Sequence, residues 1–147
     1  MIENKKEFKL ITKKTKAINP VHFGGFPSDM KKMVSLSKKY GIKIIEDAAH
    51  AAGSSFCKKK IGSHGFAVCF SFHPVKIITS GEGGIATTNS KEIADKLSIF
   101  RTHGITRDKN LIENESDGPW YYEQIDIGYN YRMTDIQAAL ANSQIKR

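Results

Sequence analysis

Four short stretches of the chain have the pattern of β-strands, and each is bounded by glycine, proline or small polar residues. They lie at 15–22, 42–47, 66–72 and 84–88, and stretches of this length and composition predict strands. The stretch at 42–47 is largely apolar up to its acidic end, which is typical of a parallel strand covered on both faces. Pro20 cannot donate a backbone hydrogen bond, so we expect the first strand to end or bulge there.

Other stretches carry the apolar spacing of amphipathic helices. From Met30, apolar residues recur at i, i+3 and i+4, which predicts a helix over 29–40 with Ser28 as its N-cap and Gly41 as its stop. The same signals predict a helix at 91–101 capped by Asn89 and Ser90, and a last helix at 136–147 that starts after Thr134 and Asp135. The order of one strand, one helix, three strands and a helix, followed by the terminal helix, indicates an α/β fold.

The segments between these elements differ in character. Residues 48–53 are small, which predicts close packing against a ligand or another part of the backbone. Residues 56–62 form a basic, hairpin-like excursion, and residues 102–120 are polar and contain glycine. A loop of that length inside a domain is usually functional or ordered by a partner. We expect residues 1–10 to be the end of a helix or a fraying terminus.

Composition places the chain among globular proteins. Of its 147 residues, 39% are hydrophobic and 26% are charged. No apolar run approaches the ~20 residues of a membrane span, and the N-terminus lacks the apolar core of a signal peptide. We therefore expect a cytoplasmic protein with no membrane partner. Cys57 and Cys69 have no partners at zinc spacing, so we expect no metal and interpret Cys69 as a core residue.

The net charge of +8 is concentrated at one end of the chain. Residues 1–16 contain six lysines against two glutamates. Such a segment could be an arm that contacts nucleic acid or an anionic membrane, a solvated helix and turn, or a source of positive field for diphosphate-bearing substrates. We favour the solvated helix and turn, because no aromatic residues interleave with the lysines and no nucleic-acid motif follows. We therefore expect no nucleic-acid partner.

One lysine lies between two predicted strands, in a loop that ends in a glycine-rich sequence. Lys76 precedes Gly-Glu-Gly-Gly at 81–84, and Asp47 ends the strand at 42–47. A lysine amine and a strand-end carboxylate are the pair that a pyridoxal phosphate (PLP) site needs. The amine bonds the cofactor, and the carboxylate keeps its pyridine nitrogen protonated. Taken alone, Lys76 would be a surface lysine and Asp47 a cap; together they favour the PLP site.

Three further polar residues are candidate cofactor contacts. Ser71 ends the strand before Lys76, where a hydroxyl and backbone N–H groups suit a phosphate; the alternative is an ordinary strand-end hydroxyl. His50 follows Asp47 by three residues, and it either hydrogen-bonds the phenolic oxygen of the cofactor or satisfies a turn. Asn130 lies between two tyrosines before the last helix, in a segment that either packs there or reaches a ligand, including one in a partner subunit.

Four segments in a fixed order and spacing give the chain a family resemblance. They are residues 15–22, 45–50, 71–84 and 128–139. Together they resemble the DegT/DnrJ/EryC1/StrS family of PLP-dependent nucleotide-sugar aminotransferases. The resemblance covers nearly the whole chain.

The resemblance implies an activity. The residues at 72–76 and 118–123 are most similar to the pseudaminic-acid branch, whose enzymes transfer an amino group from glutamate to C4 of a UDP-linked 4-keto-6-deoxy-N-acetylhexosamine. It implies PLP as the cofactor, a UDP- or dTDP-linked keto-deoxy-sugar and glutamate as substrates, and a homodimer. Sugar dehydratases of the same family carry histidine in place of Lys76, so the lysine favours transamination.

The resemblance also implies a role for each candidate residue. Lys76 would form the internal aldimine and move the proton between substrate and cofactor. Asp47 would pair with the pyridine nitrogen, and His50 would lie beside the hydroxyl of the cofactor. Ser71 would bind the phosphate, and Asn130 would reach the phosphate of the cofactor in the partner subunit.

The implied fold is larger than this chain. It is the fold-type I aminotransferase large domain, a mixed, mostly parallel sheet with flanking helices. Because family members are much longer, we expect residues 1–147 to be the central part of that PLP-binding domain, incomplete at both ends. The N-terminal part of the domain and the C-terminal small domain would be absent. The alternatives are an inactive fragment or split-gene product of such an enzyme, and a basic, non-catalytic interaction module.

Overall fold

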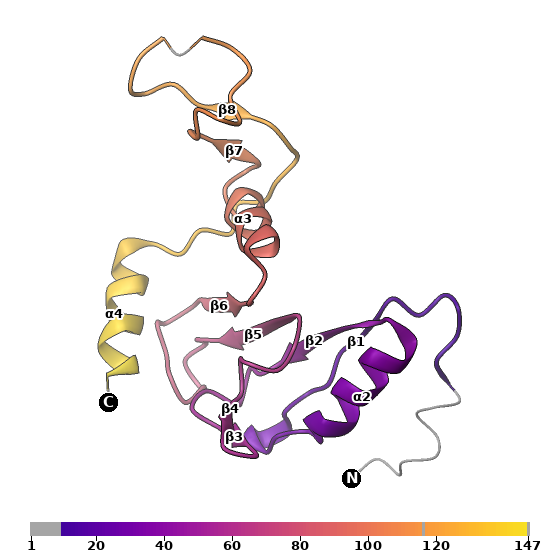
Figure 1. Ribbon diagram of the computed structural model, residues 1–147. Helices are drawn as coiled ribbons and strands as arrows, with labels where there is room; N and C mark the ends of the chain where they lie inside the picture. The colour runs from indigo at the N-terminus through magenta and orange to yellow at the C-terminus, as the bar shows by residue number, and fades with distance from the viewer. Residues whose placement is uncertain (1–9, 116, 147) are drawn as a thin grey trace. The chain divides into compact units, whose positions relative to one another are not determined.

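The computed structural model describes residues 10–115 and 117–146 and divides the chain into two compact units. The first unit ends at Thr88 and the second begins at Asn89. Figure 1 traces both units from indigo at the N-terminus to yellow at the C-terminus. The expectation for residues 1–10 falls almost wholly outside the described residues.

A mixed four-stranded sheet forms the centre of the first unit (Figure 1). Its strands, in spatial order, are β1 (Ala17–Ile18), β2 (Lys43–Asp47), β5 (Ala67–Ser71) and β6 (Gly84–Thr87). The first three are parallel, and β6 runs antiparallel to β5. The α/β class and the mostly parallel sheet are therefore confirmed, and the three later strands lie where the sequence predicts them.

The first strand is shorter than predicted. Regular pairing stops at Ile18, and the backbone pairs with β2 again at an isolated parallel bridge between Val21 and Asp47. Pro20 lies in this interval and offers only its carbonyl, which accepts the N–H of Asp47 at 2.9 Å. The missing N–H of proline accounts for the interruption.

Helix α2 (Met30–Tyr40) begins and ends close to the predicted residues. The N-cap is Asp29 and not the predicted Ser28. The carboxylate of Asp29 accepts the N–H of Lys32. Ser28 is used elsewhere: its hydroxyl donates to the carbonyl of Val21 at 2.9 Å. Gly41 ends the helix with a φ of 65°, a left-handed conformation that glycine adopts without steric cost.

Only one face of β2 is covered, contrary to the expectation of burial on both faces. Ile44 and Glu46 are buried, whereas Ile45 between them is 36% exposed. Strand β5 follows the same alternation, with Val68 buried and Cys69 exposed, so the interpretation of Cys69 as a core residue is wrong. The core lies on the α2 side of the sheet and consists of Met30, Ile44, Ala48, Ala51, Ile61 and Val68.

Two small elements complete the first unit. A 3-10 turn, η1 (Phe23–Gly25), follows the first strand. The predicted basic hairpin is present as β3 (Ser55–Phe56) paired with β4 (Lys59–Lys60). Both residues of its two-residue turn, Cys57 and Lys58, have positive φ, at 48° and 65°. Residues 48–53 are compact, as expected, since Ala48 and Ala51 belong to the core.

The second unit contains two helices and a short antiparallel pair of strands. Helix α3 (Lys91–Phe100) is capped by Ser90, as predicted. Helix α4 (Asp135–Ile145) starts with a capping box between Thr134 and Gln137. Strands β7 (Ile105–Thr106) and β8 (Glu123–Gln124) pair with each other. The segment at 102–120, predicted as a loop throughout, therefore contains a strand near its start.

Glu123 organises the rest of that segment. Its carboxylate accepts the backbone N–H groups of Glu113 at 2.9 Å and Asn114 at 3.0 Å, and the hydroxyl of Tyr121 at 2.7 Å. The backbone bond from Glu113, followed by the bond from Tyr121, lowers the pKa of Glu123 from 4.5 to about 2. A single ionised side chain thus closes the loop between β7 and β8.

No helix in the described part of the chain is long and apolar enough to cross a membrane.

Candidate functional site

Asp47 and Ser71 share one face of the sheet at the carboxyl ends of two neighbouring parallel strands. Asp47 is the last residue of β2 and is in register with Cys69 of β5. Ser71 ends β5 two residues later, and side chains two apart on a strand lie on the same face. From ordinary strand spacings, the two Cα atoms lie about 8 Å apart. In α/β sheets, ligands bind at such carboxyl ends.

Asp47 forms hydrogen bonds through its backbone N–H, its carbonyl and its side chain. Its carbonyl accepts the N–H of His22 at 3.0 Å, and its own N–H donates to Pro20. Its Oδ1 accepts the N–H of Ala49 at 3.0 Å, which fixes the direction of the half-buried carboxylate. Although Cys69 is exposed, partial loss of hydration raises the pKa of its thiol, and the negative charge of Asp47 adds to the effect.

His50 contacts η1 through both its ring and its backbone. Its Nδ1 accepts the N–H of Gly24 at 3.3 Å, and its ring meets the edge of Phe23 with centroids 6.1 Å apart. A Cβ on Gly25 would lie only 2.8 Å from the carbonyl oxygen of His50, so the two backbones are in close contact. The sequence left two roles open for His50. The structure shows one of them, because the His50 ring satisfies a backbone N–H of the η1 turn.

Lys76 lies in a loop that is closed on the end of β5. The carbonyl of Phe72 accepts the N–H of Ser80 at 3.0 Å and the hydroxyl of Thr79 at 3.2 Å, while the N–H of Phe72 donates to Gly83. These bonds join the start and the end of the loop. Lys76 itself is half-buried, and no described residue forms an ion pair with its amine.

The hydroxyl of Ser71 remains able to donate. Its Oγ accepts the N–H of His73 at 3.3 Å, the first turn of the Lys76 loop. An oxygen that accepts in this bond keeps its hydrogen available for an acceptor such as a phosphate oxygen. Four of the candidate residues belong to the first unit: Asp47, His50, Ser71 and Lys76. Asp47 and Ser71 end adjacent strands.

Asn130 is the one candidate residue that belongs to the second unit. It is exposed and forms an isolated antiparallel bridge with Thr102, next to the end of α3. Its position is therefore defined only within its own unit and not relative to the other four candidates.

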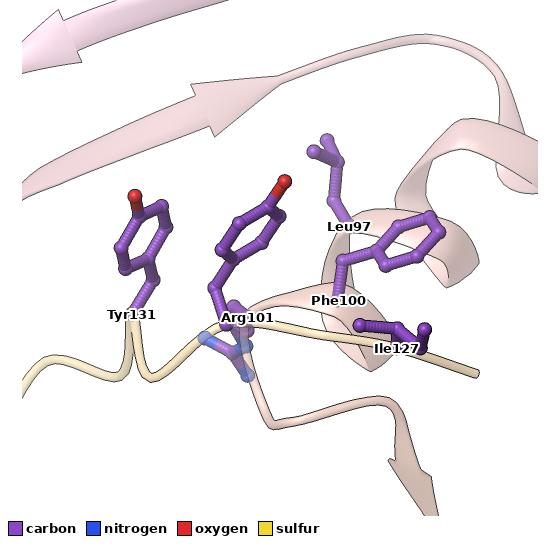
Figure 2. Close-up of a pocket in the computed structure, with 6 residues that line it drawn as sticks. Leu97, Phe100, Arg101, Ile127 and Tyr131 are labelled. Carbon is purple, nitrogen blue, oxygen red and sulfur yellow. The ribbon is translucent and has the colours of Figure 1, made fainter. Parts of the chain in front are cut away.

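An apolar pocket of about 420 Å³ lies within the second unit. Its six lining residues are Leu97, Phe100, Arg101, Ile127, Tyr129 and Tyr131. Figure 2 shows Leu97 and Phe100 projecting from α3 beside Ile127, with Tyr131 on the segment that leads to α4. Tyr129 and Tyr131 stack with ring centroids 4.9 Å apart. None of the five candidate residues lines this pocket.

A buried polar pair beside Asp47 was not expected from the sequence. His22 and Glu46 are both fully buried, and Nε2 lies 2.9 Å from Oε2. A glutamate within an apolar strand was the available signal, because a buried carboxylate requires a partner. Metal-ligating side chains do not gather in groups of three or more anywhere among the described residues.

The chain is similar to known proteins over its whole length. A profile described as the DegT/DnrJ/EryC1/StrS aminotransferase family matches residues 1–147. The uncharacterised protein MJ1066 of Methanocaldococcus jannaschii is 49% identical over 137 residues, which cover 93% of this chain and 35% of that protein. The UDP-4-amino-4,6-dideoxy-N-acetyl-beta-L-altrosamine transaminase of Campylobacter jejuni is 42% identical over 147 residues, covering 99% of this chain and 37% of the transaminase.

A solved structure is similar over nearly the whole chain. It is PseC of Helicobacter pylori, an aminotransferase involved in the biosynthesis of pseudoaminic acid. It matches with a TM-score of 0.85 and 37% identity, over 95% of this chain and 35% of PseC. This chain therefore spans about a third of the length of the proteins that it matches.

Proposed function

The chain belongs to the DegT/DnrJ/EryC1/StrS aminotransferase family, and from this premise we propose that it provides the cofactor-binding centre of a nucleotide-sugar aminotransferase. The proposed reaction moves an amino group from glutamate to a keto carbon of a UDP- or dTDP-linked deoxy-sugar. The proposed cofactor is PLP. Residues 1–147 would then be the central part of the PLP-binding large domain, in a protein that acts in the cytoplasm.

One observation carries the proposal. Asp47 and Ser71 end adjacent parallel strands on one face of the sheet, and the loop with Lys76 starts directly after Ser71. A PLP molecule has a basic ring nitrogen at one end and a phosphate at the other. A carboxylate suits the first group and a hydroxyl with strand-end N–H groups suits the second. The residues present therefore fit the cofactor.

Each residue would have a defined task. Asp47, oriented by the N–H of Ala49, would hold a proton on the ring nitrogen of the cofactor. When bound, PLP supplies an electron sink for the substrate carbon. The amine of Lys76 would hold the cofactor and then move the proton at that carbon. Ser71 would donate to the phosphate, and His50 would lie beside the hydroxyl of the ring.

The partner subunit enters through Asn130. This residue is exposed on the second unit, where a side-chain amide is accessible to another chain. We propose that it binds the phosphate of the cofactor held by a second copy, so that the working form is a homodimer. The similarity to the Campylobacter transaminase and to PseC supports a sugar nucleotide as the substrate.

Two forms of one experiment test the proposal. In the first, the purified chain is mixed with PLP, and the visible absorbance that PLP gains on covalent attachment to a lysine is recorded. We expect glutamate to bleach this band and Lys76→Ala to abolish it. Lys58→Ala is the matched control, because Lys58 is an exposed lysine of the hairpin turn, and it should leave the band unchanged.

The second form supplies the segments that the longer relatives have. Residues 1–147 replace the matching segment of the Campylobacter transaminase, which aligns with 99% of this chain. We expect the chimera to transaminate its sugar nucleotide and Lys76→Ala to lose activity. An active Lys76→Ala chimera would refute the assignment of the lysine. A folded chimera with neither a band nor activity would favour the alternative, an inactive segment of such an enzyme.

A further inference from the structure

The His22–Glu46 pair has a defined hydrogen-bond direction. The backbone N–H of Ser28 donates to Nδ1 of His22 at 3.0 Å. Because Nδ1 accepts this bond, it carries no hydrogen, and the ring hydrogen must lie on Nε2. Nε2 therefore donates to Oε2 of Glu46 at 2.9 Å. The ring is held as one neutral tautomer between a backbone amide and a carboxylate.

The backbones of His22 and Glu46 both adjoin Asp47. Glu46 is its immediate neighbour in β2, and the N–H of His22 donates to the carbonyl of Asp47 at 3.0 Å. The strand alternates, so the Glu46 side chain enters the core while that of Asp47 lies on the opposite face. A side-chain bond in the core thus joins the two segments whose backbones determine where Asp47 sits.

The same histidine begins the segment that contacts His50. Gly24, two residues after His22, donates its N–H to Nδ1 of His50 at 3.3 Å. Ser54 ties this segment to the residues after β2, because its hydroxyl donates to the carbonyl of Gly25 at 2.8 Å. His22 therefore bonds Asp47 directly, and it begins the segment through which Gly24 bonds His50.

Stability does not explain the pair. Two fully buried polar side chains lose their hydration, and an apolar pair of similar size is often as stable or more stable. Oε1 of Glu46 has no hydrogen-bond partner within the described part of the chain, which adds to the cost. Fixing one conformation is a role that buried polar groups have in some proteins.

We propose that His22 and Glu46 are positioning residues that fix the carboxylate of Asp47 and the ring of His50 in the geometry used for the cofactor. This inference rests on the proposed function for the identity of the ligand. The positioning itself is a property of the cofactor-free chain, and it is measured there first.

NMR on the full chain without cofactor gives the decisive reading. We expect the ¹⁵N shifts of His22 to report a hydrogen on Nε2, in the unmodified protein and in Glu46→Gln, whose side-chain oxygen still accepts from Nε2. In the double variant His22→Phe, Glu46→Leu, we expect the N–H of Ala49 to exchange about tenfold faster as its bond to Asp47 weakens. Ile44→Val, a buried change on the same strand, should leave that exchange rate nearly unchanged.

PLP titration is the second reading, taken from the absorbance of the bound cofactor. We expect the dissociation constant to rise about tenfold in the double variant and to stay within about threefold in Glu46→Gln, as for residues that orient a ligating group. The thermal midpoint of the double variant should be equal or higher, which a merely structural pair would not give. If the unmodified chain binds no PLP, the proposed function fails for this chain and the NMR result still decides the positioning.

Two outcomes would overturn the inference. One is a hydrogen on Nδ1 of His22, which Glu46→Gln reports even if the double variant does not fold. The other is a folded double variant in which the Ala49 N–H and the His50 ring shifts match those of the unmodified protein.

Discussion

Gly65 lies against the carboxylate of Glu46, and adding one methyl group there tests how rigidly that carboxylate is held. A Cβ at Gly65 would lie 2.6 Å from Oε1 and 3.1 Å from Cγ of Glu46, and 3.1 Å from the carbonyl oxygen of Ile44. The side chain of Glu46 cannot move aside freely, because its other oxygen bonds His22 in the core. Gly65→Ala must therefore either compress the contact or break the bond.

The magnitude follows from those two terms. Overpacking a core costs about 1–3 kcal/mol, and leaving a buried polar group without its partner costs about 1–3 kcal/mol. Since the protein can take whichever of the two costs is smaller, we expect Gly65→Ala to lower the free energy of unfolding by about 1–3 kcal/mol. The assay is urea denaturation followed by circular dichroism, compared through the midpoint at a constant slope.

A double-mutant cycle separates this contact from a general intolerance of alanine. In the Glu46→Ala background the carboxylate is gone, so Gly65→Ala should cost less, with a coupling of about 1–3 kcal/mol. Gly81→Ala is the control. Gly81 has a φ of 81° and no described atom within 4 Å of an added Cβ, so its cost of about 1–2 kcal/mol should be the same in both backgrounds. Additive costs for Gly65 and Glu46 would refute the reasoning.

Three further predictions concern other parts of the chain. Because Cys57 and Lys58 both have positive φ in a two-residue hairpin turn, replacing them with Asn-Gly should raise the free energy of unfolding by about 1–2 kcal/mol, measured by urea denaturation; no gain would contradict the turn assignment. The Glu123 carboxylate has a pKa of about 2 in the folded state against an ordinary value of 4.5, so its contribution is complete above pH 4.5 and is lost as the pH falls towards 2. The protection factor of the Asn114 amide, which corrects for the intrinsic effect of pH on exchange, should fall as the pH falls across that range, and Glu123→Gln should show the lower protection already at neutral pH; equal protection in both proteins at neutral pH would exclude the anchor. Finally, Ile127 is 86% and Tyr131 is 74% exposed, so the isolated chain should self-associate by sedimentation, and Ile127→Lys should reduce this; a monomeric protein with a sharp, cooperative melt would count against it.

Helix ends and strand locations could be predicted because local chemistry determines them. Gly41 adopts the left-handed conformation that stops α2, and Ser90 and Thr134 cap α3 and α4. The cap of α2 was misassigned because Ser28 and Asp29 are both good N-caps. Ser28 instead donates its N–H to His22 and its hydroxyl to Val21, and these are long-range contacts that local propensity does not contain.

Burial was harder to predict than secondary structure. The apolar residues of β2 predicted that both faces of the strand are covered. In the structure, Ile45 is partly exposed, and Cys69 on the neighbouring strand is exposed. Which face of a strand is covered depends on the elements that pack on it, and a run of isoleucines does not specify them. The candidate site itself was predictable in part. Asp47 and Ser71 lie at the ends of strands, as the sequence predicts, whereas the pairing of those strands and the location of Asn130 in a separate unit depend on tertiary structure.

The two acidic residues at the end of β2 show how the buried pair and the candidate site depend on each other. Glu46 and Asp47 are adjacent, so the strand places one in the core and the other on the opposite face. A shift of one residue in pairing would exchange them, because the side-chain period of a strand is two. Such a shift would take Glu46 out of the core and place either Ile45, which is apolar, or Asp47, which has a shorter side chain, opposite His22. The bond between His22 and Glu46 therefore stabilises one register of β2, and that register is the one in which Asp47 shares a face with Ser71.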